Sequence, residues 1–103
     1  MIRRKGGSRF KKRRNHKYMN YLDIELLAGT ECDGECGRWA TDKAHLDDKG
    51  TGGYDAGNVA LLCRWCHIES EKRVDKWIAE RGVDLRAKAV QRWETYQNAQ
   101  KGA

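Results

Sequence analysis

The chain has 103 residues, four cysteines, no proline and a net charge of +6, which limits it to one small domain. About 80 residues remain once the basic N-terminus is set aside, and a core of that size commonly needs a metal, disulfides or a partner chain. No apolar run approaches the roughly 20 residues of a membrane span, and no apolar signal segment follows the N-terminal charges. We therefore expect a cytoplasmic protein with no membrane partner.

The first 17 residues form a basic arm that we expect to be disordered when free. Residues 1–18 contain nine Lys/Arg and no acid, whereas the rest of the chain carries twelve Lys/Arg against fifteen Asp/Glu. A segment of this composition cannot bury apolar surface. Its uncompensated cations favour contact with nucleic-acid phosphates, and a merely solubilising tail is the alternative. The nine cations are Arg3, Arg4, Lys5, Arg9, Lys11, Lys12, Arg13, Arg14 and Lys17.

A short helix is predicted over Tyr18–Ala28. Its apolar residues Tyr18, Tyr21, Leu22 and Leu26 fall on one helical face, and Gly29 suits its end. We expect this helix to pack on the core and to deliver the chain to the first cysteine pair.

The four cysteines form two close pairs, Cys32/Cys36 and Cys63/Cys66. Two such pairs separated by a few tens of residues are typical of a tetrahedral four-cysteine zinc site, because each pair turns tightly enough to point two thiolates at one ion. In an intracellular protein, metal ligation is also favoured over disulfides. The alternative is a secreted scaffold with two disulfides.

The segment between the cysteine pairs predicts two strands around a loop. Residues 38–46 suggest a strand that leads to His45, with Trp39 in the core. Residues 47–58 are dense in Gly and Asp and must form a loop. Val59–Leu62 is a short apolar run that fits a buried strand returning antiparallel to the first.

Two helices are expected to complete the domain. The first covers residues 64–81, with Ile68, Val74, Trp77 and Ile78 buried, and ends at Gly82. The second covers residues 84–100 with Asp84 as its N-cap. Its apolar stripe is expected to pack on the domain, with a dimer face left open. The stripe consists of Leu85, Ala89, Trp93 and Tyr96.

This order of elements resembles the HNH endonucleases, and small phage-encoded members in particular. The resemblance covers about a third of the chain and is carried mainly by residues 52–67, GGYDAGNVALLCRWCH. It implies a small α+β domain over residues 18–103, with a ββα-metal core at 32–71 that a four-cysteine zinc stabilises. The matching residues are Cys32, Cys36, His45, Gly53, Asp55, Asn58, Leu62, Cys63, Cys66 and His67.

The resemblance assigns roles around one phosphodiester bond. His45 is the general base, which suits an imidazole because it titrates near neutral pH. In the family, Asn58 either braces the loop that carries the base or helps hold the catalytic ion; the resemblance assigns it the bracing role and leaves the second role open. His67 is a ligand of a catalytic divalent ion (Mg2+, Mn2+, Ni2+ or Zn2+). Glu71 lies one helical turn further on and is a second candidate ligand.

One position departs from the family pattern. Many HNH enzymes carry a metal-binding Asp or His immediately before the base, where this chain has Ala44. Asp42 should share the face of Ala44 on a regular strand. Asp47, Asp48 or Asp55 is a further source of an oxygen ligand.

Two functions follow. The first is a metal-dependent endonuclease that hydrolyses DNA, expected to be double-stranded, and that works with phage packaging or replication proteins in a host cytoplasm. The second is a catalytically degenerate, zinc-stabilised module that binds nucleic acid or protein. As base, His45 must be neutral, so the first function predicts activity that falls below about pH 6.

Overall fold

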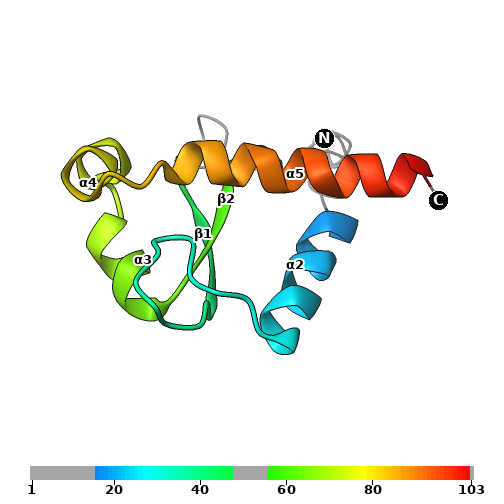
Figure 1. Ribbon diagram of the computed structural model, residues 1–103, viewed down its shortest axis with the longest axis horizontal. Helices are drawn as coiled ribbons and strands as arrows, with labels where there is room; N and C mark the ends of the chain where they lie inside the picture. The colour runs from blue at the N-terminus through cyan, green and yellow to red at the C-terminus, as the bar shows by residue number, and fades with distance from the viewer. Residues whose placement is uncertain (1–15, 48–55, 103) are drawn as a thin grey trace, which may run out of the picture.

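The computed structural model describes residues 16–47 and 56–102, which form a small α+β fold (Figure 1). Asp48, Gly53, Asp55 and residues 1–15 of the basic arm lie outside the described residues. The elements, in chain order, are α2 (His16–Ala28), β1 (Asp42–His45), the 3-10 turn η2 (Ala56–Asn58), β2 (Val59–Leu62), α3 (Arg64–Ser70), α4 (Val74–Arg81) and α5 (Leu85–Gly102).

The sheet consists of β1 and β2, which pair antiparallel as expected. The register places Asp42 opposite Leu62 and His45 opposite Val59. The predicted strand over 38–46 is too long, because the residues before β1 pair elsewhere: Trp39 forms an isolated bridge with Glu31, and the Ala40 amide donates to the Thr30 carbonyl. This pairing turns Ala40 inward and leaves Trp39 65% exposed, so the prediction of a core Trp39 is wrong.

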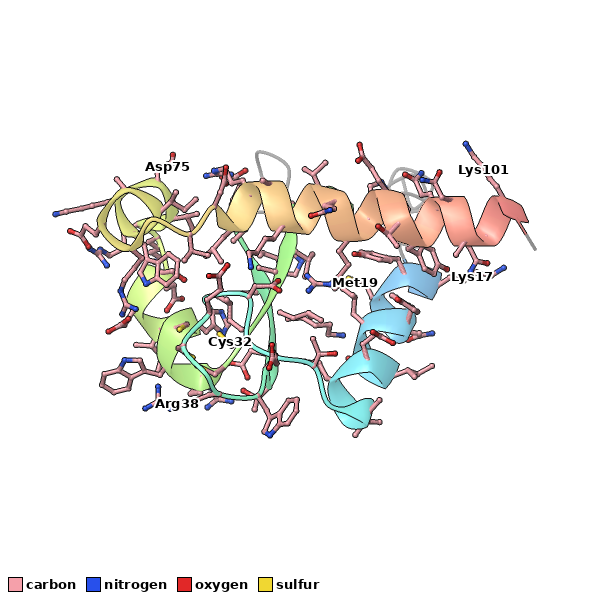
Figure 2. All side chains as sticks on the ribbon, viewed as in Figure 1. Lys17, Met19, Cys32, Arg38, Asp75 and Lys101 are labelled. Carbon is pink, nitrogen blue, oxygen red and sulfur yellow. The ribbon has the colours of Figure 1, made fainter. Side chains whose placement is uncertain are left out.

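Strand β2 is buried on both faces, which explains its continuous apolar run VALL. Ala60 and Leu62 face one core cluster, which contains three of the cysteines and Trp77. Val59 and Leu61, the alternate residues of β2, belong to a second cluster that also contains residues of α2 and is packed by residues of α5. Figure 2 shows Met19 entering this second cluster from α2, below α5.

The second cluster is aromatic and fixes α2 against the long helix α5. Tyr18 is 1% exposed, and its ring lies 4.7 Å from that of Trp93 and 5.0 Å from that of Tyr96. The apolar stripe of α5 therefore packs on the domain, as predicted. Helix α2 begins at His16, two residues before its predicted start, so Lys17 belongs to this helix rather than to the arm. Gly29, with a φ of 102°, follows its end.

The single helix predicted over 64–81 is wrong, since the chain breaks into α3 and α4. Lys72 adopts a left-handed φ of 62° between them. The break reorients the chain so that Val74 and Trp77 are buried, at 6% and 1% exposure, whereas the predicted core residue Ile68 is 62% exposed. Ile78 packs against the first cluster as expected.

The later boundaries agree with their predicted signals. Gly82 ends α4 with a φ of 75° in the left-handed region, a conformation that glycine adopts without steric cost. The carboxylate of Asp84 accepts a hydrogen bond of 3.0 Å from the Ala87 amide, as an N-cap does. Within the described residues, no helix has both the length and the apolar character that a membrane crossing requires.

Candidate functional site

The four cysteines converge on one point. Their sulfurs all lie within 4.8 Å of one another, and the Sγ atoms of Cys36 and Cys63 are 3.5 Å apart. Four sulfurs at the usual Zn–S distance of about 2.3 Å stand about 3.8 Å apart at the corners of a tetrahedron. The cluster therefore has the dimensions of a tetrahedral thiolate site, and it could hold a metal ion such as zinc.

Backbone amides surround the sulfurs as donors. The amides of Gly34 and Cys63 each donate to Cys32 Sγ at 3.3 Å, and the amide of Cys66 donates to Cys63 Sγ at 3.4 Å. The first knuckle is the segment from Cys32 to Gly37. It turns through two residues with left-handed backbone, Glu35 and Gly37. Amide donors of this kind favour the thiolate over the thiol, which is the form that binds a metal.

The negative charge of several neighbouring thiolates is a second reason to expect a bound cation. Cys32, Cys63 and Cys66 are at most 4% exposed, and all four cysteines are free thiols, without the bonds of the two-disulfide alternative. Burial raises the pKa of both Cys66 and Cys32. Burial acts the same way at Cys36, but hydrogen bonds from the Arg38 amide and from neighbouring thiols outweigh it and lower its pKa to about 6. A divalent cation would remove the cost of holding several thiolates together.

A buried ion pair supports the first knuckle, and no local sequence pattern predicts it. Asp33, 6% exposed, accepts two hydrogen bonds of 2.7 Å from the guanidinium of Arg92 on α5. It also accepts the Leu61 amide at 2.9 Å. Asp33 therefore joins the knuckle to β2 and to α5. Only the three-dimensional fold brings these partners together, because 59 positions separate Asp33 from Arg92.

The two candidate catalytic histidines line one pocket. It measures about 280 Å³ and lies between the end of β1, which carries His45, and α3, which carries His67. The side chain of His45 is exposed, whereas that of His67 is 34% exposed. The remaining lining residues are Lys43, Leu46, Asp47, Glu71 and Lys72.

His67 is tied to strand β1 through Asp42. Nδ1 of His67 lies 2.8 Å from Oδ2 of Asp42, and the Nε atom of Arg64 donates to the same oxygen at 2.9 Å. Thr41 donates to Oδ1 at 2.8 Å. Burial alone would raise the pKa of Asp42, but the hydrogen bonds from Arg64, His67 and Thr41 outweigh it and lower the pKa to about 2. The carboxylate is thus held ionised beside the imidazole.

Asn58 braces the chain directly after His45. Its Oδ1 accepts the Asp47 amide at 3.1 Å, and its Nδ2 donates to the Asp47 carbonyl at 3.3 Å. The Asn58 carbonyl accepts the Leu46 amide at 2.9 Å. With 8% of its surface exposed, Asn58 fixes the backbone from which the His45 side chain projects. This contact pattern matches the bracing role among the two roles considered for Asn58.

Glu71 and Asp47, the other candidate oxygen ligands that the structure describes, differ in their surroundings. Glu71 lines the pocket and is exposed. Ala44 is 2% exposed in the core and offers no ligand. Asp47 is held by a bidentate pair with Arg86, with both contacts at 2.9 Å. Within residues 16–47 and 56–102, the cysteine quartet is the only group of three or more metal-binding side chains that converge on one point.

Comparisons with protein-family models, with curated proteins and with solved structures give no match.

Proposed function

We propose that this protein is a metal-dependent endonuclease of the HNH type that hydrolyses DNA. One observation carries the proposal: His45 and His67, which come from different elements, line the same pocket. Lys43 and Lys72 line it as well. Two imidazoles and the ammonium group of Lys72 suit an anionic phosphodiester, whereas the ammonium group of Lys43 is paired with Asp23 at 2.7 Å.

His45 would act as the general base. It takes a proton from the attacking water, the water oxygen bonds to phosphorus, and the bond to the 3′ oxygen breaks. The 3′ oxygen takes a proton from solvent water, which leaves a 5′-phosphate and a 3′-hydroxyl. An exposed imidazole at the end of a short strand can reach a phosphate on a large polymer. The brace from Asn58 limits the movement of the backbone beneath it.

His67 and Glu71 are the groups that would hold the divalent ion, since both line the pocket and stand one turn apart on the chain. When bound, such an ion neutralises charge on the phosphate and on the leaving oxygen. Two protein ligands leave room for substrate oxygens and water, which suits Mg2+ or Mn2+.

DNA is the proposed substrate because the chain carries nine cations within residues 1–18. Deleting residues 1–15, which leaves α2 intact, should weaken binding to a duplex and reduce the slope of affinity against salt. Fluorescence anisotropy at several salt concentrations measures both quantities. Unchanged affinity and slope would remove the arm from the binding surface.

Plasmid nicking with Mg2+, Mn2+ or Ni2+ tests the catalytic part. The wild type should nick, His45→Ala should lose at least about 100-fold in rate, and Gln91→Ala on the exposed face of α5 should behave as wild type. Activity of the wild type should fall in acid, because a protonated His45 cannot take a proton from water. Nicking that His45→Ala leaves intact would contradict the proposed mechanism.

Two observations favour a second candidate, a zinc-stabilised module that binds nucleic acid without cutting it. Ala44 stands where many HNH enzymes carry a metal-binding Asp or His. The described residues also contain no second cluster of three metal-binding side chains. Duplex binding without nicking in any of the three metals would select this candidate.

A further inference from the structure

The structure shows a partner for His67 that its sequence neighbours do not supply. Nδ1 of His67 lies 2.8 Å from Oδ2 of Asp42. A histidine that binds a metal through one ring nitrogen commonly donates its other N–H to a carboxylate, which fixes both the tautomer and the ring orientation. The contact between Asp42 and His67 has that form.

The carboxylate of Asp42 is itself held in place. Oδ2 accepts from Arg64 Nε at 2.9 Å, and Oδ1 accepts from Thr41 Oγ1 at 2.8 Å and from Arg64 Nη2 at 3.4 Å. Its side chain is 12% exposed. The backbone beneath it is fixed by pairing with Leu62 in the sheet. Both oxygens are thus occupied by protein donors, which suits a fixed acceptor better than a metal ligand.

From this geometry we propose that Asp42 is the positioning residue of the site: it accepts the Nδ1–H of His67 and leaves Nε2 as the nitrogen available to a divalent ion in the pocket. Asp42 thereby supports the ion through His67, and it does not replace the direct ligand that is missing at Ala44. The inference rests on the proposed function only for the presence of that ion. The orientation of His67 can be measured without it.

The first test is the tautomer of His67 in the full, zinc-loaded chain at pH 8 without added Mg2+ or Mn2+. Long-range proton–nitrogen NMR distinguishes the two neutral tautomers, and a His67→Gln spectrum assigns the signal. The wild type should show the Nδ1–H form, whereas Asp42→Ala should lose this preference. Glu80→Ala is the matched control, because Glu80 is an exposed carboxylate that pairs with Arg73 at 2.7 Å and neither residue lines the pocket, and it should match the wild type.

The second test is Mn2+ binding, followed by paramagnetic broadening of the His67 signal. Asp42→Ala should weaken this binding about 10- to 100-fold, and Glu80→Ala should not change it. Loss of Mn2+ binding in Asp42→Ala with an unchanged His67 tautomer would make Asp42 a direct ligand and overturn the proposal.

The wild-type spectrum also decides the matter if Asp42→Ala does not fold. The Nε2–H tautomer, or a doubly protonated ring, at pH 8 would overturn the proposal. A wild type that holds the Nδ1–H tautomer but binds no Mn2+ would instead contradict the proposed nuclease, with the orientation of His67 by Asp42 upheld. The two failures are therefore distinguishable.

Discussion

Gly34 tests the geometry of the cysteine cluster, because the knuckle leaves no room for a side chain there. A Cβ at this position would lie 2.9 Å from Cys66 Sγ, 3.2 Å from the ring of Trp77 and 3.4 Å from Cys32 Sγ. An ordinary contact needs about 3.6 Å, so Gly34→Ala must move the Cys66 sulfur or the knuckle by about 0.7 Å. Metal–ligand distances tolerate only about 0.2 Å.

Overpacking of this kind costs about 1–3 kcal/mol, which corresponds to zinc affinity weakened by roughly 5- to 150-fold. Competition with a chromogenic chelator measures this change. Gly57→Ala is the matched control, since its Cβ would meet Val90 and Trp93 at ordinary distances of 3.6 Å or more. Wild-type zinc affinity and stability in Gly34→Ala would refute the close packing of the knuckle against the sulfurs.

Three further substitutions test the framework. Arg92→Met leaves the buried carboxylate of Asp33 unpaired, so urea denaturation should show a loss of about 3 kcal/mol, and a loss below about 1 kcal/mol would contradict the pairing. Asn58→Ala removes both side-chain bonds to Asp47 and should cost about 1–3 kcal/mol by the same assay, together with a slower nicking rate. Burial raises the pKa of Tyr18 to about 12, so the stability that its protonated hydroxyl contributes is complete below pH 10 and is lost between pH 10 and 12. That loss amounts to about 3 kcal/mol. Tyr18→Phe should shrink this alkaline loss without destabilising the protein at pH 7, because the hydroxyl has no hydrogen-bond partner among the described residues.

Local patterns predicted those elements whose cause is local. Strand β2 has the predicted bounds because four consecutive apolar residues between a loop and a cysteine pair fit only a buried strand. Gly82 and Asp84 end and begin helices through interactions that span at most four residues. The spacing of the two cysteine pairs also predicted that the four thiols meet, although Cys36 and Cys63 are 27 positions apart.

The errors arise where tertiary packing decides. Nothing in the sequence around Lys72 prohibits a helix, and α3 and α4 separate because Trp77 reaches the core only after a turn. Trp39 is apolar but exposed, since the register of a bridge with Glu31 turned its neighbour Ala40 inward.

Within the candidate site, sequence reasoning found the residues but not their connections. It named Asp42 only as one of several sources of an oxygen. The contact with His67 depends on the strand register and on the first turn of α3, which place the two side chains 2.8 Å apart. The bond between Asn58 and the backbone of Asp47 likewise depends on the path of the chain at both ends of the loop.

The cysteine cluster also determines whether the pocket exists. Cys63 follows β2 directly and caps α3, since its Sγ accepts the Cys66 amide. His67 is therefore held by helix α3, which Cys63 caps, and His45 lies on the strand paired with β2. Removing a metal ion bound by the cysteine cluster should unfold this junction and separate the two imidazoles. We expect protein stripped with a strong chelator to lose nicking, Mg2+ alone to leave it inactive, and Zn2+ followed by Mg2+ to restore it, with circular dichroism following the fold in parallel. Recovery of nicking with Mg2+ alone, while the cysteines remain free of metal, would show that the pocket does not need the cluster.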